Sequence, residues 1–182
     1  MASRRIRLLG DPALRVRAQP VQTPVSPGTR LIADDLRDSL RAARKRHGMG
    51  RAIAATQIGA PVRVILIDTD RKRTTMLNPE IVDVGPDDFT VWDDCFCFPE
   101  LLVRVTRAHQ VSVRYLDIRG KERVIELQGP MAELVQHEID HLDGILALDR
   151  AAGLDPFAYR AEWEQHHPPA ERYGAPTPRQ FI

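Results

Sequence analysis

The clearest hydrophobic periodicity in the chain lies between Thr29 and His47. Charged residues there separate apolar and alanine positions that recur every three or four residues: Leu31, Ile32, Leu36, Leu40 and Ala43. This spacing places the apolar side chains on one face of a helix. Gly48 and Gly50 follow directly and favour termination. The pattern predicts an amphipathic helix over residues 29–47.

Strand-like patterns follow this helix. Five segments are β-branched, apolar or alternating: 62–67, 74–77, 80–84, 110–115 and 123–127. Asn78-Pro79 predicts a break between the second and the third, and the Gly120-containing stretch 117–121 is typical of a hairpin loop. These segments predict a mainly antiparallel sheet.

A second helix is predicted from Gly129-Pro130, because proline is tolerated in the first helical turn. Its apolar stripe contains Met131, Leu134, Val135, Ile139 and Leu142, and Gly144 is a candidate C-terminal cap. Helices segregated from an antiparallel sheet define one α+β domain.

Composition excludes several classes of partner. The 182 residues include 26 basic and 25 acidic side chains, a formal charge of +1, so no global field would attract DNA or an anionic membrane. No uncharged run approaches membrane-spanning length, and the first residues lack a signal-peptide apolar stretch. We expect a soluble, cytoplasmic protein that recognises its partners locally.

The candidate chemistry lies inside the second predicted helix, where residues 137–141 form an H-E-x-x-H motif. Residues four apart share a helix face, so His137 and His141 can reach one metal ion with Glu138 beside it. A divalent metal lowers the pKa of bound water towards ~7, and a carboxylate can then transfer the proton. The alternative is an ordinary amphipathic helix with surface histidines. A catalytic site of this kind also needs a third protein ligand, for which Cys95 and Cys97 are the candidates.

Longer motifs carry a resemblance to a known family. Residues 136–144 match Q-H-E-x-D-H-L-x-G, the third signature of peptide deformylases, without a mismatch. Residues 93–97, D-D-C-F-C, resemble the second signature, E-G-C-L-S, with only the cysteine kept. Residues 50–57 resemble the first, G-x-G-x-A-A-x-Q, with alanine for the second glycine; a register with Gly48 and Gly50 as the glycines also ends on Gln57. The match runs from about Ile6 to Arg150.

The resemblance implies a ligand set and a reaction. Cys95, His137 and His141 would hold the metal, Glu138 would move protons, and the Gln57 amide and the Phe96 backbone N–H would hold the oxyanion. Iron(II) is the implied metal, with zinc, nickel or cobalt able to replace it. The implied reaction removes the formyl group of N-formylmethionine from nascent polypeptides and releases formate. A transient contact with the ribosome is compatible with such a substrate.

The resemblance also implies an architecture, with antiparallel β-sheets around a central helix that carries H-E-x-x-H. Residues 1–150 would form the catalytic domain. Residues 151–182 change in composition towards proline and would form a C-terminal extension, partly helical or disordered.

Substrate recognition is where the sequence departs from the family. Four residues are candidates for substrate binding: Arg51, Ala52, Ile53 and Asp94. A charge at Arg51 makes a methionine pocket less apolar, which affects substrate choice more than metal chemistry. The alternatives are therefore a deformylase or amidase for another formylated substrate, or a low-activity relative that binds formylated N-termini. Endopeptidases with H-E-x-x-H usually take a downstream third ligand, which the match around Cys95 disfavours.

Overall fold

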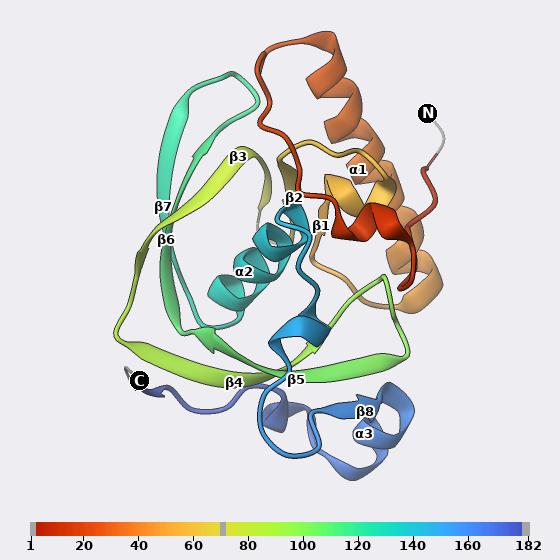
Figure 1. Ribbon diagram of the computed structural model, residues 1–182, viewed down its shortest axis with the longest axis vertical. Helices are drawn as coiled ribbons and strands as arrows, with labels where there is room; N and C mark the ends of the chain where they lie inside the picture. Colours follow the sequence, from red (N-terminus) through yellow and green to blue (C-terminus); the bar gives the residue numbers. More distant parts are fainter. Residues whose placement is uncertain (1–2, 70–71, 180–182) are drawn as a thin grey trace.

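Two antiparallel sheets surround a central helix, α2 (Pro130–Leu142), in the computed structural model, which describes residues 3–69 and 72–179 (Figure 1). The first sheet has the order β1-β2-β3-β6-β7, with β1 Ala52–Ala54, β2 Val64–Asp68, β3 Arg73–Val84, β6 Gln110–Leu116 and β7 Glu122–Gln128. The second has the order β8-β5-β4-β9, with β4 Asp87–Asp94, β5 Leu101–Ala108, β8 Phe157–Tyr159 and β9 Thr177–Pro178. The predicted single-domain α+β fold is confirmed.

Helix α1 (Pro27–His47) covers the other face of the first sheet. All apolar residues of β2 are buried, and they alternate between the two helices. Ile65 and Ile67 pack with α2, whereas Val64 and Leu66 pack with α1. Side chains of a strand point to opposite faces in turn, so a strand between two helices needs apolar residues at every position. This explains the continuous apolar run in the sequence.

Both predicted helices are confirmed. The Ser26 hydroxyl caps α1 by accepting the Thr29 N–H at 3.1 Å, and Gly48 ends the helix in a left-handed conformation. Helix α2 begins at Pro130, as predicted. The hairpin of β6 and β7 is also present, with Asp117 and Gly120 in its turn.

The predicted break at Asn78-Pro79 is wrong, because β3 continues through it. Asn78 has a positive φ of 51°, and the pairing of β3 with β6 shifts register between Leu77 and Glu80. The Asn78 side chain exchanges two hydrogen bonds with the Val21 backbone, at 2.7 and 3.0 Å. The dipeptide therefore makes a β-bulge that bends the strand.

The segment after residue 150 adds to the second sheet. Strand β8 pairs with β5 and β9 pairs with β4, while α3 (Arg160–His166) lies on the side of β4 and β5 away from α2 (Figure 1). Trp163 is buried there, and its ring lies 6.2 Å from that of Trp92. The division of the chain at residue 150 stays a prediction. None of the described helices is long and apolar enough to cross a membrane.

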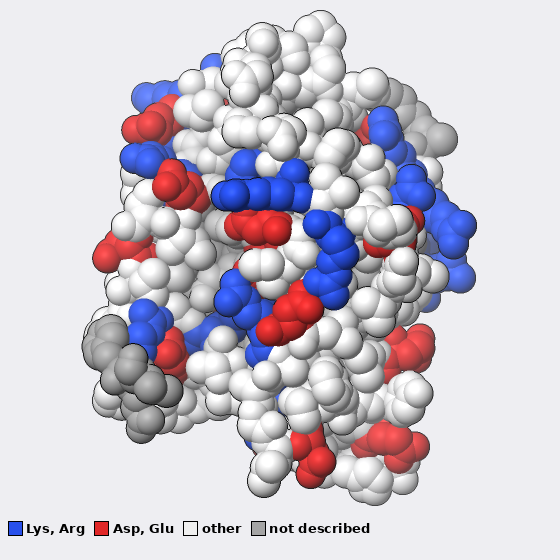
Figure 2. Space-filling view, viewed as in Figure 1, with Lys and Arg blue, Asp and Glu red and all other residues white. Residues whose placement is uncertain are grey.

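The described residues also contain four short 3-10 helices: η1 Pro12–Arg15, η2 Ala55–Ile58, η3 Ala147–Arg150 and η4 Pro169–Arg172. Basic and acidic side chains lie side by side at the centre of the face drawn in Figure 2. Ion pairs gather around the C-terminal end of α2, including Arg63 with Asp143 at 2.6 Å and Arg150 with Asp140 at 2.7 Å. Cations near that end also stabilise the helix dipole.

We predict that Gly144→Ala destabilises the fold more than Gly48→Ala, a matched control. Both glycines have positive φ, 75° and 69°, where a side chain costs about 1–2 kcal/mol. A Cβ at Gly144 would lie 2.6 Å from the Arg15 carbonyl oxygen, whereas nothing lies within 4 Å at Gly48. The collision should add about 1–3 kcal/mol in urea unfolding. Equal losses for the two variants would contradict this packing.

Candidate metal centre and active-site cleft

Three buried side chains converge beside α2: Cys95, His137 and His141, one ligand atom of each lying within 4.8 Å of the others. Cys95 follows the last residue of β4, and its Sγ lies 3.2 Å from Nε2 of His141. The two histidines are one helical turn apart, so their rings meet edge to face. The structure therefore brings the three predicted ligands together.

Asp93 orients the first imidazole. Nδ1 of His137 lies 3.0 Å from the Asp93 carboxylate, which leaves Nε2 for a ligand. Burial alone would lower the pKa of His137, but the Asp93 carboxylate raises it to about 10. An aspartate, one methylene shorter than the glutamate of the signature that residues 93–97 resemble, reaches the ring.

Arg107 from β5 supports Asp93. Its guanidinium is buried, donates to Asp93 at 3.1 Å, and also pairs with Asp140 of α2. Burial alone would raise the pKa of Asp93, but His137 and Arg107 hold it below its usual range. The carboxylate therefore stays ionised beside the imidazole.

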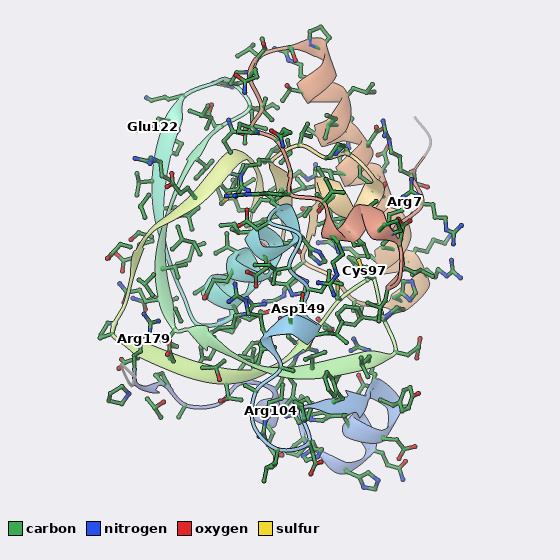
Figure 3. All side chains as sticks on the ribbon, in the orientation of Figure 1. Arg7, Cys97, Arg104, Glu122, Asp149 and Arg179 are labelled. Carbon is green, nitrogen blue, oxygen red and sulfur yellow. The ribbon has the colours of Figure 1, made fainter. Side chains whose placement is uncertain are left out.

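Gln57 faces the cysteine sulfurs from η2. Its Oε1 accepts the Ala54 N–H at 2.8 Å, which directs its amide Nε2 to Cys95 Sγ at 3.5 Å and Cys97 Sγ at 3.6 Å. Cys97 is also buried, and Figure 3 shows it in the interior, yet it does not belong to the ligand cluster. Burial and Cys97 raise the pKa of the Cys95 thiol, which a coordinated divalent cation would deprotonate.

Glu138 is buried beside His137, and its Oε2 has no hydrogen-bond partner within residues 3–69 and 72–179. Burial raises its pKa to about 7, so the carboxylate can both accept and release a proton near neutrality. An unpartnered buried oxygen beside a thiol and two imidazoles is the environment expected next to a metal-bound ligand. The residues present therefore fit a divalent metal.

A second acidic cluster shares His137 and contains Asp93 and Glu133. Its carboxylates are already paired, Asp93 with Arg107 and Glu133 with Arg51 at 2.9 Å. The cysteine cluster is thus the better metal site.

A cleft of about 220 Å³ opens onto the ligand cluster. Arg51, Ala52, Asp94 and Phe96 of the predicted set line it, together with Gln57 and Glu138. Ile53 does not reach the cleft, because its side chain is fully buried in the core between α1 and the sheet.

Six cleft residues were not among the predicted site residues: Met49, Gly50, Glu133, Leu134, Arg172 and Tyr173. Glu133 lies four residues before His137, so helical spacing could have placed it on the metal-facing side. Arg172 and Tyr173 come from the C-terminal segment. No local pattern marks them, because their position depends on how that segment pairs with β4.

Comparisons with known proteins agree with this site. The family model described as Polypeptide deformylase matches residues 3–157. A peptide deformylase of Rhodopseudomonas palustris (strain BisA53) is 37% identical over 161 residues, which cover 85% of this chain and 86% of the relative.

Solved structures give the same answer. The crystal structure of peptide deformylase from Thermotoga maritima has a TM-score of 0.77 and 32% identity, covering 84% of this chain and 100% of that chain. A Met-Ala-Ser-bound class I type b peptide deformylase from Acinetobacter baumannii has a TM-score of 0.74 and 28% identity, covering 82% and 98%. Similarity over most of both chains, in sequence and in fold, shows that this chain belongs to the polypeptide deformylase family and is an enzyme of that kind.

Proposed function

We propose that this enzyme is a metal-dependent hydrolase that removes the N-formyl group from N-formylmethionine at the N-terminus of nascent polypeptides and releases formate. One observation carries the proposal: Cys95 and His137 of the buried cluster with His141 line the same cleft as Glu138, whose buried Oε2 has no hydrogen-bond partner among the described residues.

The proposed cofactor is iron(II), with zinc, nickel or cobalt as substitutes. A thiolate and two imidazoles form a donor set that suits these borderline metals. A divalent metal held there would supply Lewis acidity, which polarises a carbonyl and lowers the pKa of water.

The chain's own groups would handle the proton and the developing charge. Glu138 would accept a proton from the attacking water at Oε2 and deliver it to the leaving amine, a role that a pKa of about 7 supports. The Gln57 amide, held by the Ala54 N–H, would donate to the oxygen of the tetrahedral intermediate together with the Phe96 backbone N–H.

The proposed substrate draws support from a relative. The Acinetobacter baumannii enzyme was crystallised with Met-Ala-Ser, a peptide that begins with methionine. Phe96, Met49 and Leu134 give this cleft an apolar part that suits such a side chain. We also propose a cytoplasmic location, and a transient ribosome contact stays a prediction.

A second candidate is deformylation of a different formylated substrate. The ion pair of Arg51 and Glu133 in the cleft wall favours it. A wholly apolar substrate side chain would remove water from these charges and offer them no hydrogen bond in return, which costs free energy. A low-activity relative that only binds formylated N-termini is less well supported, because Glu138 and Gln57 are both present at the cleft.

Glu138→Ala tests the proton-transfer role. We expect the metal-loaded variant to release formate from formyl-Met-Ala-Ser about 10²–10⁴ times more slowly than the wild type, because the acid–base group is lost. Metal content, measured on protein purified without oxygen, should be unchanged. A variant that keeps its metal and the wild-type rate would remove Glu138 from the mechanism.

Cys95→Ala and Cys97→Ala test the ligand assignment as a matched pair, since both cysteines are buried and two residues apart. We expect Cys95→Ala to lose bound metal and formate release, and Cys97→Ala to retain both. A metal that binds only the folded state raises its thermal stability. Removal of the metal by a chelator should therefore lower the midpoint of thermal unfolding of Cys97→Ala but not of Cys95→Ala. Equal metal content in the two variants would overturn the assignment.

A further inference from the structure

The C-terminal segment contributes two side chains to the active-site cleft. Arg172 ends η4, and Tyr173 follows it and pairs with Val91 of β4. Both residues line the same cleft as His137 and Glu138. The proposed reaction gives neither side chain a role. Their contacts indicate what they could bind.

Arg172 shares its carboxylate partner with another arginine. Its Nη2 lies 2.7 Å from one oxygen of Asp94, and Nη2 of Arg160 lies 2.8 Å from the other oxygen. Arg160 has a second partner, Glu164 at 3.5 Å, but that carboxylate is 58% exposed and is screened by water. One partly exposed carboxylate therefore serves two guanidinium groups.

Arg172 also has donors to spare. Among residues 3–69 and 72–179, Asp94 is the one carboxylate that its guanidinium contacts, and Nη2 makes the shortest contact. The side chain is 25% exposed and faces the cleft. A guanidinium has five N–H donors in a planar fork that matches a carboxylate.

Tyr173 adds a hydroxyl at the same wall. Its oxygen accepts a hydrogen bond from Arg51 at 3.1 Å, and Arg51 is itself fixed by Glu133 at 2.9 Å and by the Pro130 carbonyl at 3.1 Å. Because Arg51 donates to this oxygen, the hydroxyl hydrogen of Tyr173 is available for a ligand.

The cleft is small and has both apolar and polar lining residues. Its volume of about 220 Å³ is below the ~300–1,000 Å³ of sites for drug-sized ligands. Met49, Phe96 and Leu134 are apolar lining residues, whereas Arg172 and Tyr173 are polar ones. Such a cleft suits a compact substrate that carries an apolar part and an anionic group close together.

We propose that Arg172 and Tyr173 bind a carboxylate of the formylated substrate, so that the enzyme prefers N-formylated amino acids or very short peptides with a carboxylate close to the formyl amide. The inference rests on the proposed deformylase chemistry and develops the second candidate, a formylated substrate other than the N-terminus of a nascent polypeptide. The carboxylate can come from the main chain, as in free N-formylmethionine, or from a side chain, as in N-formylglutamate derivatives.

Two matched pairs of compounds test the carboxylate and its source. N-formylmethionine and N-formylmethioninamide differ in the main-chain charge, whereas the amides of N-formylglutamate and N-formylglutamine differ in the side-chain charge. We expect kcat/KM for formate release to favour the acid in at least one pair by about tenfold or more, the usual range for a charge-assisted contact. The pair that shows the preference identifies the source.

Variants of Arg172 test the residue. Arg172→Gln should bring the acid-to-amide ratio close to one, mainly through KM of the acid, and Arg172→Lys should keep part of the preference. Arg179→Gln is the matched control. Arg179 lies in the same C-terminal segment and is also 25% exposed. It pairs with Asp88, near the other end of β4 from Asp94, the partner of Arg172 (Figure 3). Its ratio should equal that of the wild type.

Calorimetric binding of the four compounds to the metal-loaded Glu138→Ala variant gives a readout that needs no turnover. Acid and amide bound with equal Kd in both pairs, or hydrolysed with equal kcat/KM, would overturn the carboxylate site while leaving deformylation intact. No formate from any compound would instead count against the proposed function, and the binding ratios would still decide the role of Arg172. An acid preference that survives Arg172→Gln undiminished would also overturn the assignment.

Discussion

The buried ion pairs of Arg107 are the interactions on which the geometry of the candidate metal site depends. Arg107 lies on β5 and pairs with Asp93 of β4 and Asp140 of α2, so it joins the second sheet to the central helix. Asp93 in turn fixes the ring of His137. Loss of one partner of a buried ion pair leaves an uncompensated charge and costs about 3–5 kcal/mol. The same charges that hold the sheet against the helix thus set the orientation of a ligand.

The apolar core fixes the remaining ligands. Helix α2 packs between the two sheets, and its core side chains Val135 and Leu142 are fully buried, so the histidines on the same helix cannot rotate away from Cys95.

Gly50 shows how closely the cleft is packed. Its φ is +112°, and a Cβ there would lie 2.0 Å from the ring of Phe96. Phe96, in the segment that resembles the second signature, therefore requires glycine at position 50, in the segment that resembles the first.

The sequence predicted the helices, the hairpin and the two histidine ligands because each has a local signal, whereas Cys95 was implied by the resemblance of residues 93–97 to a family signature. Period 3.6 marks α1 and α2, and H-E-x-x-H lies within one helical turn. The sequence pattern missed β4 and β5 for a physical reason. Their inward positions alternate correctly, Phe89, Val91 and Asp93 on one strand and Val103, Val105 and Arg107 on the other, and all are buried. A charged residue ends each apolar alternation, and only the folded structure shows that the two charges pair.

The cleft wall differs from the candidate metal cluster in burial and in how its side chains are held. The cleft wall is also where the sequence departs from the family signatures. Ligand side chains are buried and held by several partners, so a change at one affects all of them. Arg51, Arg172 and Tyr173 are partly exposed, and each is held by pairings on one side of the cleft. If these residues bind the substrate as proposed, a change among them would alter which substrate is accepted without moving His137 or Cys95. The segment that supplies Arg172 and Tyr173 pairs with β4, the strand that leads into Cys95, so specificity can diverge on a scaffold whose chemistry stays fixed.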